Sequence, residues 1–256
     1  MPISLNFTGQ IFRLGVSKTS VLRGAKIETN IIFNGDCTNG MEAWGGQADL
    51  ILTDPPFNLS VKNNFHTLKG RHGIDFGEWD NGFDLTGWIP AAIERLRMGG
   101  SILVFTAWRN MGTLATALES SGCLVKEMLQ WKKSNPMPRN RDRLYVTSCE
   151  FAIWATKGKG WVFNRQRETY ENTIFEYPIV SAKQRIHTTQ KPVELMQDLI
   201  LIHSNPDDIV LDPFMGSGTT AIAAIRTGRR FVGFEIDDTY YTLANERIDI
   251  ECEKSA

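Results

Sequence analysis

The sequence contains little cysteine and no long apolar run. Its four cysteines are scattered, with no Cys-x-x-Cys pair and no histidine at metal-ligand spacing, so we expect neither a disulfide-stapled scaffold nor a metal site. No stretch approaches the roughly 20 apolar residues that span a bilayer, so no membrane segment is expected. The N-terminus has no basic region followed by an apolar core, so no secretory signal is expected and the protein is predicted to be cytoplasmic.

An excess of one charge sign is also missing, because the formal net charge of the 256 residues is −1. Hydrophobic residues make up 42% and charged residues 22%, which excludes a disordered tail or a collagen-like rod and fits one large or two small globular domains. The charge is unevenly placed, with 13 Lys and Arg against 6 Asp and Glu from Lys126 to Lys191. Such a basic middle indicates either a face for a polyanion or a solvated surface with uneven charge.

Internal repeats and low-complexity tracts are absent, and short apolar runs alternate with helical patterns. The runs are bounded by Gly, Pro or polar residues, which is typical of buried parallel strands; they cover residues 31–33, 48–53, 101–106, 208–211 and 230–234. The helical patterns cover residues 84–98, 111–121, 192–203, 219–227 and 238–250. This alternation predicts an α/β fold with a doubly wound, mostly parallel sheet.

Two segments interrupt the alternation. Residues 58–81 are polar and lack a period, so we expect a long loop over the active site. Residues 132–190 contain one convincing strand, 150–156, and most of the basic charge. Since long irregular segments in a compact domain usually carry function, we expect a small irregular recognition region there.

The segment Asp212-Pro-Phe-Met-Gly-Ser-Gly-Thr-Thr220 lies between an expected strand and an expected helix. Gly216 and Gly218 permit a tight turn close to a ligand, and the helix that follows offers free N–H groups. A dinucleotide fingerprint requires a third glycine where this chain has Ala221, and no Gly-Lys-Ser/Thr of a phosphate loop follows. By itself the pattern also fits an ordinary strand–turn–helix.

Glu235 ends the next expected strand, about 20 residues beyond these glycines, where a carboxylate can accept hydrogen bonds from a ribose diol. Alone it would be a solvated strand end. Together with the glycine turn it predicts a nucleoside cofactor other than NAD.

The segment Asp54-Pro55-Pro56-Phe57 follows the expected strand 48–53. Two prolines stiffen the backbone, and would hold the Asp54 carboxylate and the Pro55 carbonyl on one side as acceptors. Phe57 adds a flat apolar face. Two acceptors beside an aromatic ring form a pocket for a planar amino group, at the strand end where α/β proteins place their sites. A merely Pro-stiffened loop explains the prolines but not the rest.

These motifs resemble those of the DNA amino-methyltransferases that use S-adenosylmethionine. The family's (D/N/S)PP(Y/F/W) tetrapeptide is similar to Asp54–Phe57, and its FxGxG turn is similar to Phe214–Gly218. The tetrapeptide comes before the turn, a circularly permuted order similar to that of the family's beta group. The resemblance covers roughly residues 30–250 and implies the Rossmann-like methyltransferase fold.

Three further blocks support the resemblance. Asn34-Gly35-Asp36-Cys37 resembles the GD(C/S) block, whose acid contacts the cofactor adenine. Residues 131–138 resemble the W-x-K-x-NP-x-P segment that lines the target-base pocket. Residues 187–192 resemble the H(P/S)TQKP block that closes over the cofactor, with Thr188 where Pro or Ser is usual.

The resemblance implies transfer of a methyl group to the N6 amine of a flipped-out adenine in DNA. It places the catalytic pocket at Asp54, Pro55, Pro56 and Phe57. It places cofactor binding at Asp36, Cys37, Lys191, Asp212, Phe214, Gly216, Ser217, Gly218, Thr219, Thr220 and Glu235. It places the target base beside Trp131 and Asn135. The residues of the basic middle are expected to hold the DNA phosphates; these are Lys132, Lys133, Arg139, Arg141 and Arg143.

The same resemblance divides the chain. The expected parts are an N-terminal extension (1–29), a catalytic and cofactor-binding core (30–131 and 187–256), a DNA target-recognition region (132–186) and an active-site loop (58–81). DNA is the expected partner. A recognition region this short indicates either a short target or a homodimer that shares the task.

Three other functions fit parts of the pattern. Cytosine-N4 methylation is the nearest, although Ser commonly heads the tetrapeptide for cytosine and Asp for adenine. Methylation of an RNA base or a protein glutamine is the second, and those enzymes usually keep the cofactor turn ahead of the tetrapeptide. A non-catalytic DNA-binding regulator on the same fold is the third, and it would not need the intact catalytic set.

Overall fold

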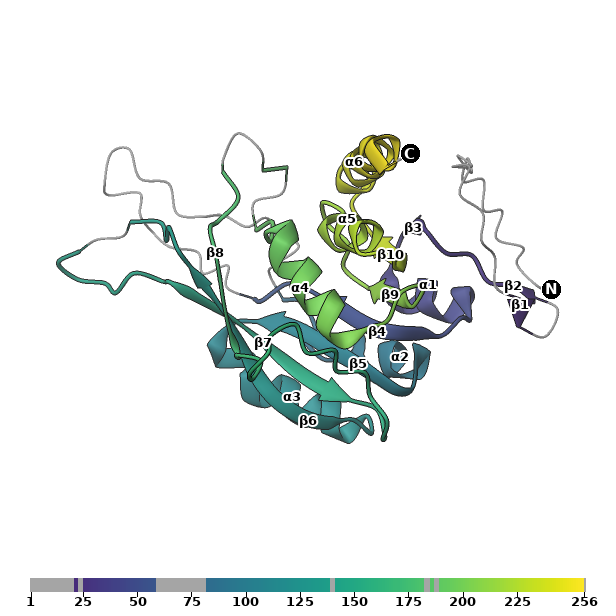
Figure 1. The fold of residues 1–256 in the computed structure, drawn as a ribbon, viewed down its shortest axis with the longest axis horizontal. Helices are drawn as coiled ribbons and strands as arrows, with labels where there is room; N and C mark the ends of the chain where they lie inside the picture. The colour runs from purple at the N-terminus through teal and green to yellow at the C-terminus, as the bar shows by residue number, and fades with distance from the viewer. Residues whose placement is uncertain are drawn as a thin grey trace.

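The computed structural model describes residues 21–22, 25–58, 82–138, 141–181, 185–186 and 189–255. An eight-stranded sheet runs through the centre in the order β3-β10-β9-β4-β5-β7-β6-β8 (Figure 1). These strands are β3 (Ile31–Asn34), β10 (Arg230–Glu235), β9 (Ile209–Asp212), β4 (Ala48–Thr53), β5 (Leu96–Thr106), β7 (Cys149–Thr156), β6 (Leu124–Lys133) and β8 (Ile174–Tyr177). Within this sheet only β7 runs against the others, so the predicted mostly parallel α/β sheet is confirmed. Apart from it, β1 (Val21–Leu22) and β2 (Ala25–Lys26) form a short antiparallel pair.

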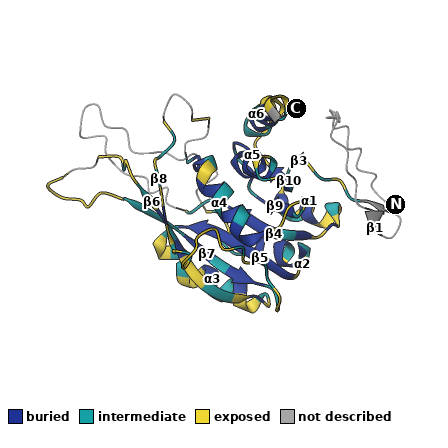
Figure 2. Cartoon of the chain, in the orientation of Figure 1, coloured by how far each residue is buried: buried dark blue, intermediate teal, exposed yellow. Residues whose placement is uncertain are grey.

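Helices cover both faces of the sheet. One face carries α4 (Val193–His203), α5 (Thr219–Arg226) and α6 (Asp238–Ser255), and the other carries α1 (Cys37–Trp44), α2 (Ile89–Arg95) and α3 (Met111–Ser120). Side chains that alternate along β4 enter the two cores in turn, since Leu50 and Leu52 pack toward α4 and α5 while Ile51 packs toward α1 and α2. The central strands β10, β9, β4 and β5 are therefore buried on both sides (Figure 2), as the middle of a doubly wound sheet requires.

The predicted helix 84–98 is wrong at its C-terminal end. Helix α2 stops at Arg95, and β5 begins at Leu96. Gly99 and Gly100 therefore lie inside a strand, where the pairing of β4 with β5 shifts register. A Cβ on Gly100 would lie 2.9 Å from the Asp49 carbonyl oxygen, so glycine is needed because two backbones approach closely.

The other predicted strands and helices are found with ends shifted by a few residues, but several elements were not predicted. These are α1, β6, β8, the short pair β1 and β2, and the 3₁₀ turn Trp108–Asn110. Only Leu129 and Trp131 of β6 are buried, and its charged residues hide the strand pattern. The predicted recognition region 132–186 is consequently not separate from the core, because it contains β7, which lies inside the sheet between β5 and β6.

Parts of the predicted segments fall outside the described residues. These are residues 1–20 and 23–24 of the N-terminal extension, 59–81 of the active-site loop, 139–140 and 182–184 of the recognition region, and 187–188 and 256 of the core. Among the described residues, no helix combines the length and apolar character needed to cross a membrane.

Candidate active site

The structure brings the Asp54 tetrapeptide and the glycine turn together. Strands β4 and β9 are parallel neighbours, so the segments that follow Thr53 and Asp212 leave the sheet at the same edge. The Thr53 hydroxyl donates a hydrogen bond of 2.7 Å to the Asp212 carboxylate. The two motifs thus share one edge of the sheet, as the sequence predicts.

Asp212 lies beneath the turn rather than facing a ligand. Both of its carboxylate oxygens are occupied, accepting hydrogen bonds from the Thr53 hydroxyl, the Thr220 hydroxyl at 2.6 Å and the Phe214 N–H at 3.0 Å. Burial raises the pKa of Asp212 to about 6. Its place in the structure is that of a residue that shapes the turn.

The two glycines of the turn have different surroundings. Both have positive φ, +52° at Gly216 and +77° at Gly218. A Cβ on Gly218 would lie 3.3 Å from the Ala244 side chain of α6, so this glycine permits close packing. A Cβ on Gly216 would meet no described atom closer than the Phe214 carbonyl oxygen at 4.0 Å, so this side of the turn faces open space. The site therefore has room for a ligand against Gly216.

The remaining residues of the turn are held by packing and hydrogen bonds. The ring of Phe214 packs edge-on against Phe83 and Trp88. Arg247 of α6 donates to the Ser217 carbonyl oxygen at 2.9 Å and to the Thr219 hydroxyl at 3.2 Å. These contacts fix the backbone on which a cofactor would lie.

Two carboxylates flank the turn at the ends of β10 and β3. Glu235 accepts the Gly216 N–H at 2.7 Å, and the Glu235 carbonyl oxygen accepts the Gly35 N–H at 2.8 Å, which brings Asp36 to the same edge. Asp36 caps α1 by accepting the Asn39 N–H at 3.0 Å. Carboxylate oxygens beside an open glycine turn fit the hydroxyl and amino groups of a nucleoside cofactor.

Cys37 follows Asp36 as the first residue of α1. It is buried, and burial raises the pKa of its thiol to about 12, so it stays a neutral thiol.

Asp54 lies in a buried charged cluster. Its Oδ2 is 2.5 Å from Lys191 Nζ, and Lys191 Nζ is also 3.0 Å from Glu150 Oε2. Glu150 Oε1 is in turn 2.7 Å from Lys133 Nζ. The other Asp54 oxygen, Oδ1, is buried and has no hydrogen-bond partner among the described residues. Burial raises the pKa of Asp54 to about 6 against the lowering effect of Lys191.

The rest of the tetrapeptide lines the same pocket. Lys191 Nζ lies 5.4 Å from the centre of the Phe57 ring, and the Asn110 side chain donates to the Phe57 carbonyl oxygen at 2.9 Å. Pro55 is buried and Pro56 partly exposed, as expected of a stiffened turn. The next residue, Asn58, exchanges two hydrogen bonds with the Phe83 backbone, at 2.6 and 2.9 Å.

The structure places the Lys191 side chain in the charged cluster at Asp54. The resemblance groups it with the cofactor residues, whereas its ammonium group lies against Asp54 and Glu150. His187 and Thr188 of the same block are outside the described residues.

The predicted base-contacting role of Trp131 disagrees with its burial. Trp131 is 3% exposed, and its indole N–H donates to the Tyr177 carbonyl oxygen at 2.9 Å. Its ring therefore supports the pocket wall from inside the core. Asn135 is exposed and accepts the Ile179 N–H at 2.7 Å, which ties the segment after β6 to the segment after β8.

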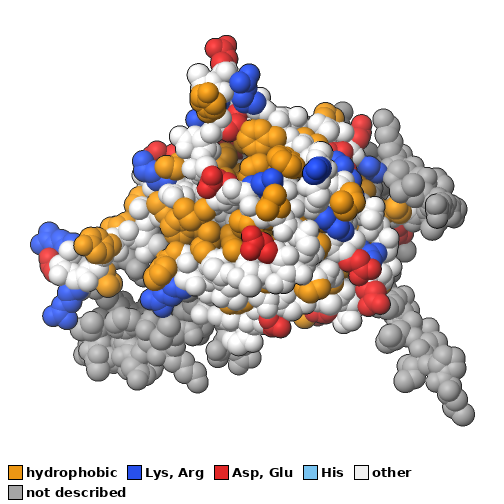
Figure 3. Space-filling model, turned by 90° about the horizontal axis from the view of Figure 1, so that it is seen from below, with side chains coloured by type: hydrophobic (Ala, Val, Ile, Leu, Met, Phe, Trp, Pro, Cys, Tyr) orange, Lys and Arg blue, Asp and Glu red, His pale blue; other side chains and the backbone are white. Residues whose placement is uncertain are grey.

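The predicted DNA-binding cations lie at the end of β6 and on the connection from β6 to β7. Arg141 and Arg143 are exposed on this connection, which projects at the left of Figure 1. At the same end of the molecule, Figure 3 shows basic and apolar side chains together. Exposed apolar residues of the connection include Met137, Leu144 and Tyr145, the last 98% exposed. Lys132 is half-exposed and pairs with Glu176 at 2.9 Å; Arg139 is outside the described residues.

Glu150 was missed as a site residue, and Lys133, expected among the phosphate-holding cations, pairs with Glu150 instead. Glu150 is a charged residue near the start of an otherwise apolar strand, which is the available sequence signal. Because β7 is antiparallel, its first residues lie at the edge where the parallel strands end. The signal points to the site only once the direction of β7 is known.

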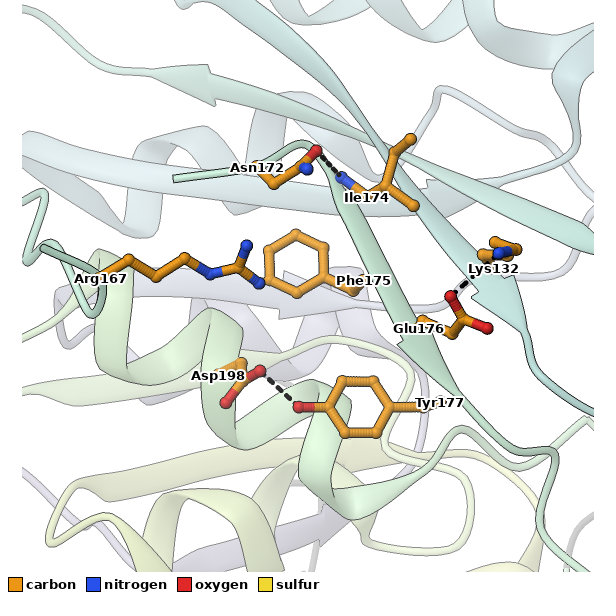
Figure 4. A pocket seen from close by; sticks show the side chains of 8 residues that line it. All are labelled: Lys132, Arg167, Asn172, Ile174, Phe175, Glu176, Tyr177 and Asp198. Carbon is orange, nitrogen blue, oxygen red and sulfur yellow. Dashed lines mark hydrogen bonds and ion pairs between the residues drawn. The ribbon is translucent and has the colours of Figure 1, made fainter. Parts of the chain in front are cut away.

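A separate cavity of about 450 Å³ lies between β8 and α4 (Figure 4). Its lining includes Lys132, Arg167, Glu176, Tyr177 and Asp198. The Tyr177 hydroxyl donates to Asp198 at 2.5 Å. Opposite charges balance one another there, so the cavity favours no ligand of one sign. In the described part of the chain, no group of three or more His, Cys, Asp or Glu is arranged to hold a metal ion.

Comparison with known families agrees with this arrangement. The profile of the N6/N4 methyltransferase family, described as DNA methylase, matches residues 48–246. The chain belongs to this family. Since its tetrapeptide precedes its glycine turn, this methyltransferase is a member of the beta group.

Individual relatives of this methyltransferase cover most of its length. The type II methyltransferase M.HinfI of Haemophilus influenzae is 28% identical over 245 residues, which span 86% of this chain and 68% of the relative. The type II methyltransferase M2.DpnII of Streptococcus pneumoniae is 30% identical over 229 residues, 80% of this chain and 84% of the relative.

Solved structures share the fold. The complex of M1.HpyAVI with SAM is 35% identical, with a TM-score of 0.70 over 85% of this chain and 98% of that one. The cytosine-N4-specific PvuII DNA methyltransferase is 17% identical, with a TM-score of 0.61 over 87% and 91% of the two chains, and shows a common fold. The predicted Rossmann-like methyltransferase fold is confirmed.

Proposed function

We propose that this methyltransferase methylates the N6 amine of adenine in DNA, using S-adenosylmethionine as the methyl donor. The observation that carries the proposal is the Asp54 carboxylate beside the glycine turn. One of its oxygens is held by Lys191, and the other is buried with no partner among the residues that the structure describes. Aspartate at the head of the tetrapeptide favours adenine over cytosine, by resemblance to the family. Because its relatives are type II methyltransferases of bacteria, we infer that it acts in the cytoplasm.

The geometry around Asp54 fits the activation of an amino group. A buried carboxylate oxygen without a partner costs about 1–3 kcal/mol, a cost that a substrate N–H can remove. An adenine amine is a poor nucleophile because its lone pair is delocalised into the ring. Hydrogen bonds from N6 to Asp54 Oδ1 and to the Pro55 carbonyl oxygen favour a tetrahedral nitrogen with its lone pair turned toward the methyl group.

The proton balance needs no strong base. S-adenosylmethionine, when bound at the glycine turn, supplies a methyl group on a positively charged sulfur. As the N–C bond forms and the S–C bond breaks, the amine proton becomes acidic, and Asp54 Oδ1 can accept it before it passes to water. Alignment of amine and methyl group contributes up to about 7–11 kcal/mol. The Thr53–Asp212 hydrogen bond supports that alignment by joining the two strand ends.

DNA contact is proposed for the segment between β6 and β7. Flipping the target base costs a few kcal/mol, which stacking on Phe57 offsets. Exposed Arg141 and Arg143 would contact phosphates and hold the duplex beside the pocket.

Methyl incorporation tests the proposal directly. The full chain is incubated with DNA and S-adenosylmethionine labelled in its methyl group, and the DNA is digested to nucleosides and separated. Label in N6-methyl-2′-deoxyadenosine is expected, and none with Asp54→Ala. Label in N4-methyl-2′-deoxycytidine would transfer the assignment to cytosine. DNA binding without incorporation would favour a regulator, and incorporation into RNA alone would reject DNA as substrate.

A further inference from the structure

Four charged side chains from four segments form an alternating row that ends at Asp54. Lys133 of β6 pairs with Glu150 of β7, and Glu150 pairs with Lys191, which precedes α4. Lys191 then pairs with Asp54, which follows β4. Two ammonium groups and two carboxylates therefore balance one another at the carboxyl edge of the sheet.

This row is costly for a purely structural feature. Lys191 is 3% exposed, and it also lies 5.1 Å from the ring centre of buried Phe105. Removing charges from water costs several kcal/mol per ion, and apolar residues of similar volume often stabilise a core as well or better. Buried charged rows of this kind cluster at functional sites.

The row also controls which Asp54 oxygen is free. Lysine has three N–H donors, of which Lys191 directs one to Asp54 Oδ2 and another to Glu150 Oε2. Without Glu150, the ammonium group would be free to move across both oxygens of Asp54. Lys133 holds the second oxygen of Glu150 and so fixes the direction in which Glu150 pulls.

We propose that Glu150 and Lys133 are positioning residues for methyl transfer, an inference that rests on the proposed function. Glu150 holds the Lys191 ammonium on one oxygen of Asp54 and keeps the other oxygen available to the amino group of the target base. Lys133 fixes Glu150 in that orientation.

Removing the charge of Glu150 and removing the charge of Lys133 should change the pKa of Asp54 in opposite directions. Among the described residues the charges facing Asp54 are Lys191, Glu150, Lys133 and, from β9, Asp212. Burial raises the pKa of Asp54, Lys191 and Lys133 lower it, and Glu150 raises it. Loss of the Glu150 charge should therefore lower the Asp54 pKa, and loss of the Lys133 charge should raise it.

The test uses Glu150→Gln and Lys133→Met in the full chain, labelled with ¹³C at the aspartate carboxyl carbons. The resonance that disappears in Asp54→Asn reports the titration of Asp54, without DNA or cofactor. Its pKa is expected to fall by about one pH unit in Glu150→Gln and to rise by about the same amount in Lys133→Met, the size expected for one nearby charge. Glu127→Gln, an equal charge change toward the other end of β6, is the matched control and should leave the titration unchanged.

The kinetic readout is kcat for methyl transfer against pH. The acid limb of this profile should move to lower pH in Glu150→Gln and to higher pH in Lys133→Met, as the Asp54 pKa does. In Glu150→Gln, kcat should fall by up to about 100-fold, while the affinity for S-adenosylmethionine stays within about twofold of the parent. Thermal unfolding checks that each variant is folded, and if Glu150→Gln does not fold, Lys133→Met decides alone.

The failures are distinguishable. A titration of Asp54 that is unchanged, or that moves the same way in both variants, would overturn the inference while leaving the proposed function intact. Opposite titration shifts with an unaltered kcat profile would also overturn it. A wild-type chain that transfers no methyl group to DNA would overturn the proposed function and, with it, this one.

Discussion

The hydroxyl of Thr53 donates a 2.7 Å hydrogen bond to the carboxylate of Asp212, joining residues 159 positions apart in the sequence. Thr53 immediately precedes Asp54, the proposed acceptor for the target amine, and Asp212 lies two residues before the cofactor turn Phe214–Gly218. Both residues are buried. This bond therefore sets how the acid is placed relative to the turn, a geometry on which methyl transfer depends.

Thr53→Val should remove this link at nearly constant volume. We expect about 1 kcal/mol less free energy of unfolding in urea and a fall in kcat, because Asp212 loses one of three donors. Thr106→Val on β5 is the matched control, since the Thr106 hydroxyl is buried and no described residue pairs with it. That substitution should be neutral or stabilising. Equal losses of stability in the two variants would contradict the role given to the bond.

The glycines of the turn should separate cofactor binding from folding. Gly216→Val and Gly218→Val each place a side chain at positive φ, at a cost of about 1–2 kcal/mol. At Gly216 the new side chain would point into the open side of the turn, so affinity for S-adenosylmethionine should be lost. At Gly218 it would press on Ala244, so unfolding free energy should fall further. Calorimetric titration measures the affinity for S-adenosylmethionine, and urea unfolding measures the free energy of unfolding. Undiminished cofactor affinity in Gly216→Val would refute the placement of the cofactor against Gly216.

Asp54→Ala should abolish methyl transfer and spare cofactor binding. The variant removes the acceptor proposed for the target amine, and a loss of at least about 100-fold in kcat is expected. Lys191 keeps its pairing with Glu150, so the fold and the affinity for S-adenosylmethionine should be retained. Turnover within about tenfold of the parent would be too fast for an essential acceptor.

The parallel half of the fold was predictable because its signals are local. An apolar run followed by Asp54 or by Asp212 marks both a buried strand and the edge where it ends. Strand β6 was not predicted, because most of its side chains are exposed or partly exposed and several are charged. Strand β8 has only four residues and pairs with β6, so it becomes recognisable only after β6 is known.

The charged cluster around Asp54 depended on strand directions that the sequence does not reveal. Asp54 and Gly216 stand in motifs that carry their chemistry in sequence. Glu150 reaches the site because β7 runs against its neighbours, and strand direction is set by pairing across distant segments. The same pairing places Trp131 inside the core instead of on a base, although its motif favours a base contact.

The arginines between β6 and β7 should control the salt dependence of DNA binding. Arg141 is 93% exposed and pairs only loosely with Asp142, at 3.4 Å, so desolvating it against a phosphate breaks no buried contact. Arg141→Gln and Arg143→Gln should each weaken binding to all sequences alike and reduce the slope of log K against log salt by about 1. Lys159→Gln, an exposed cation beyond the far end of β7, is the control and should leave the slope unchanged. Fluorescence anisotropy with one labelled duplex at four salt concentrations gives these slopes. If both arginine variants kept the parent slope, the segment between β6 and β7 would not be the phosphate-binding surface.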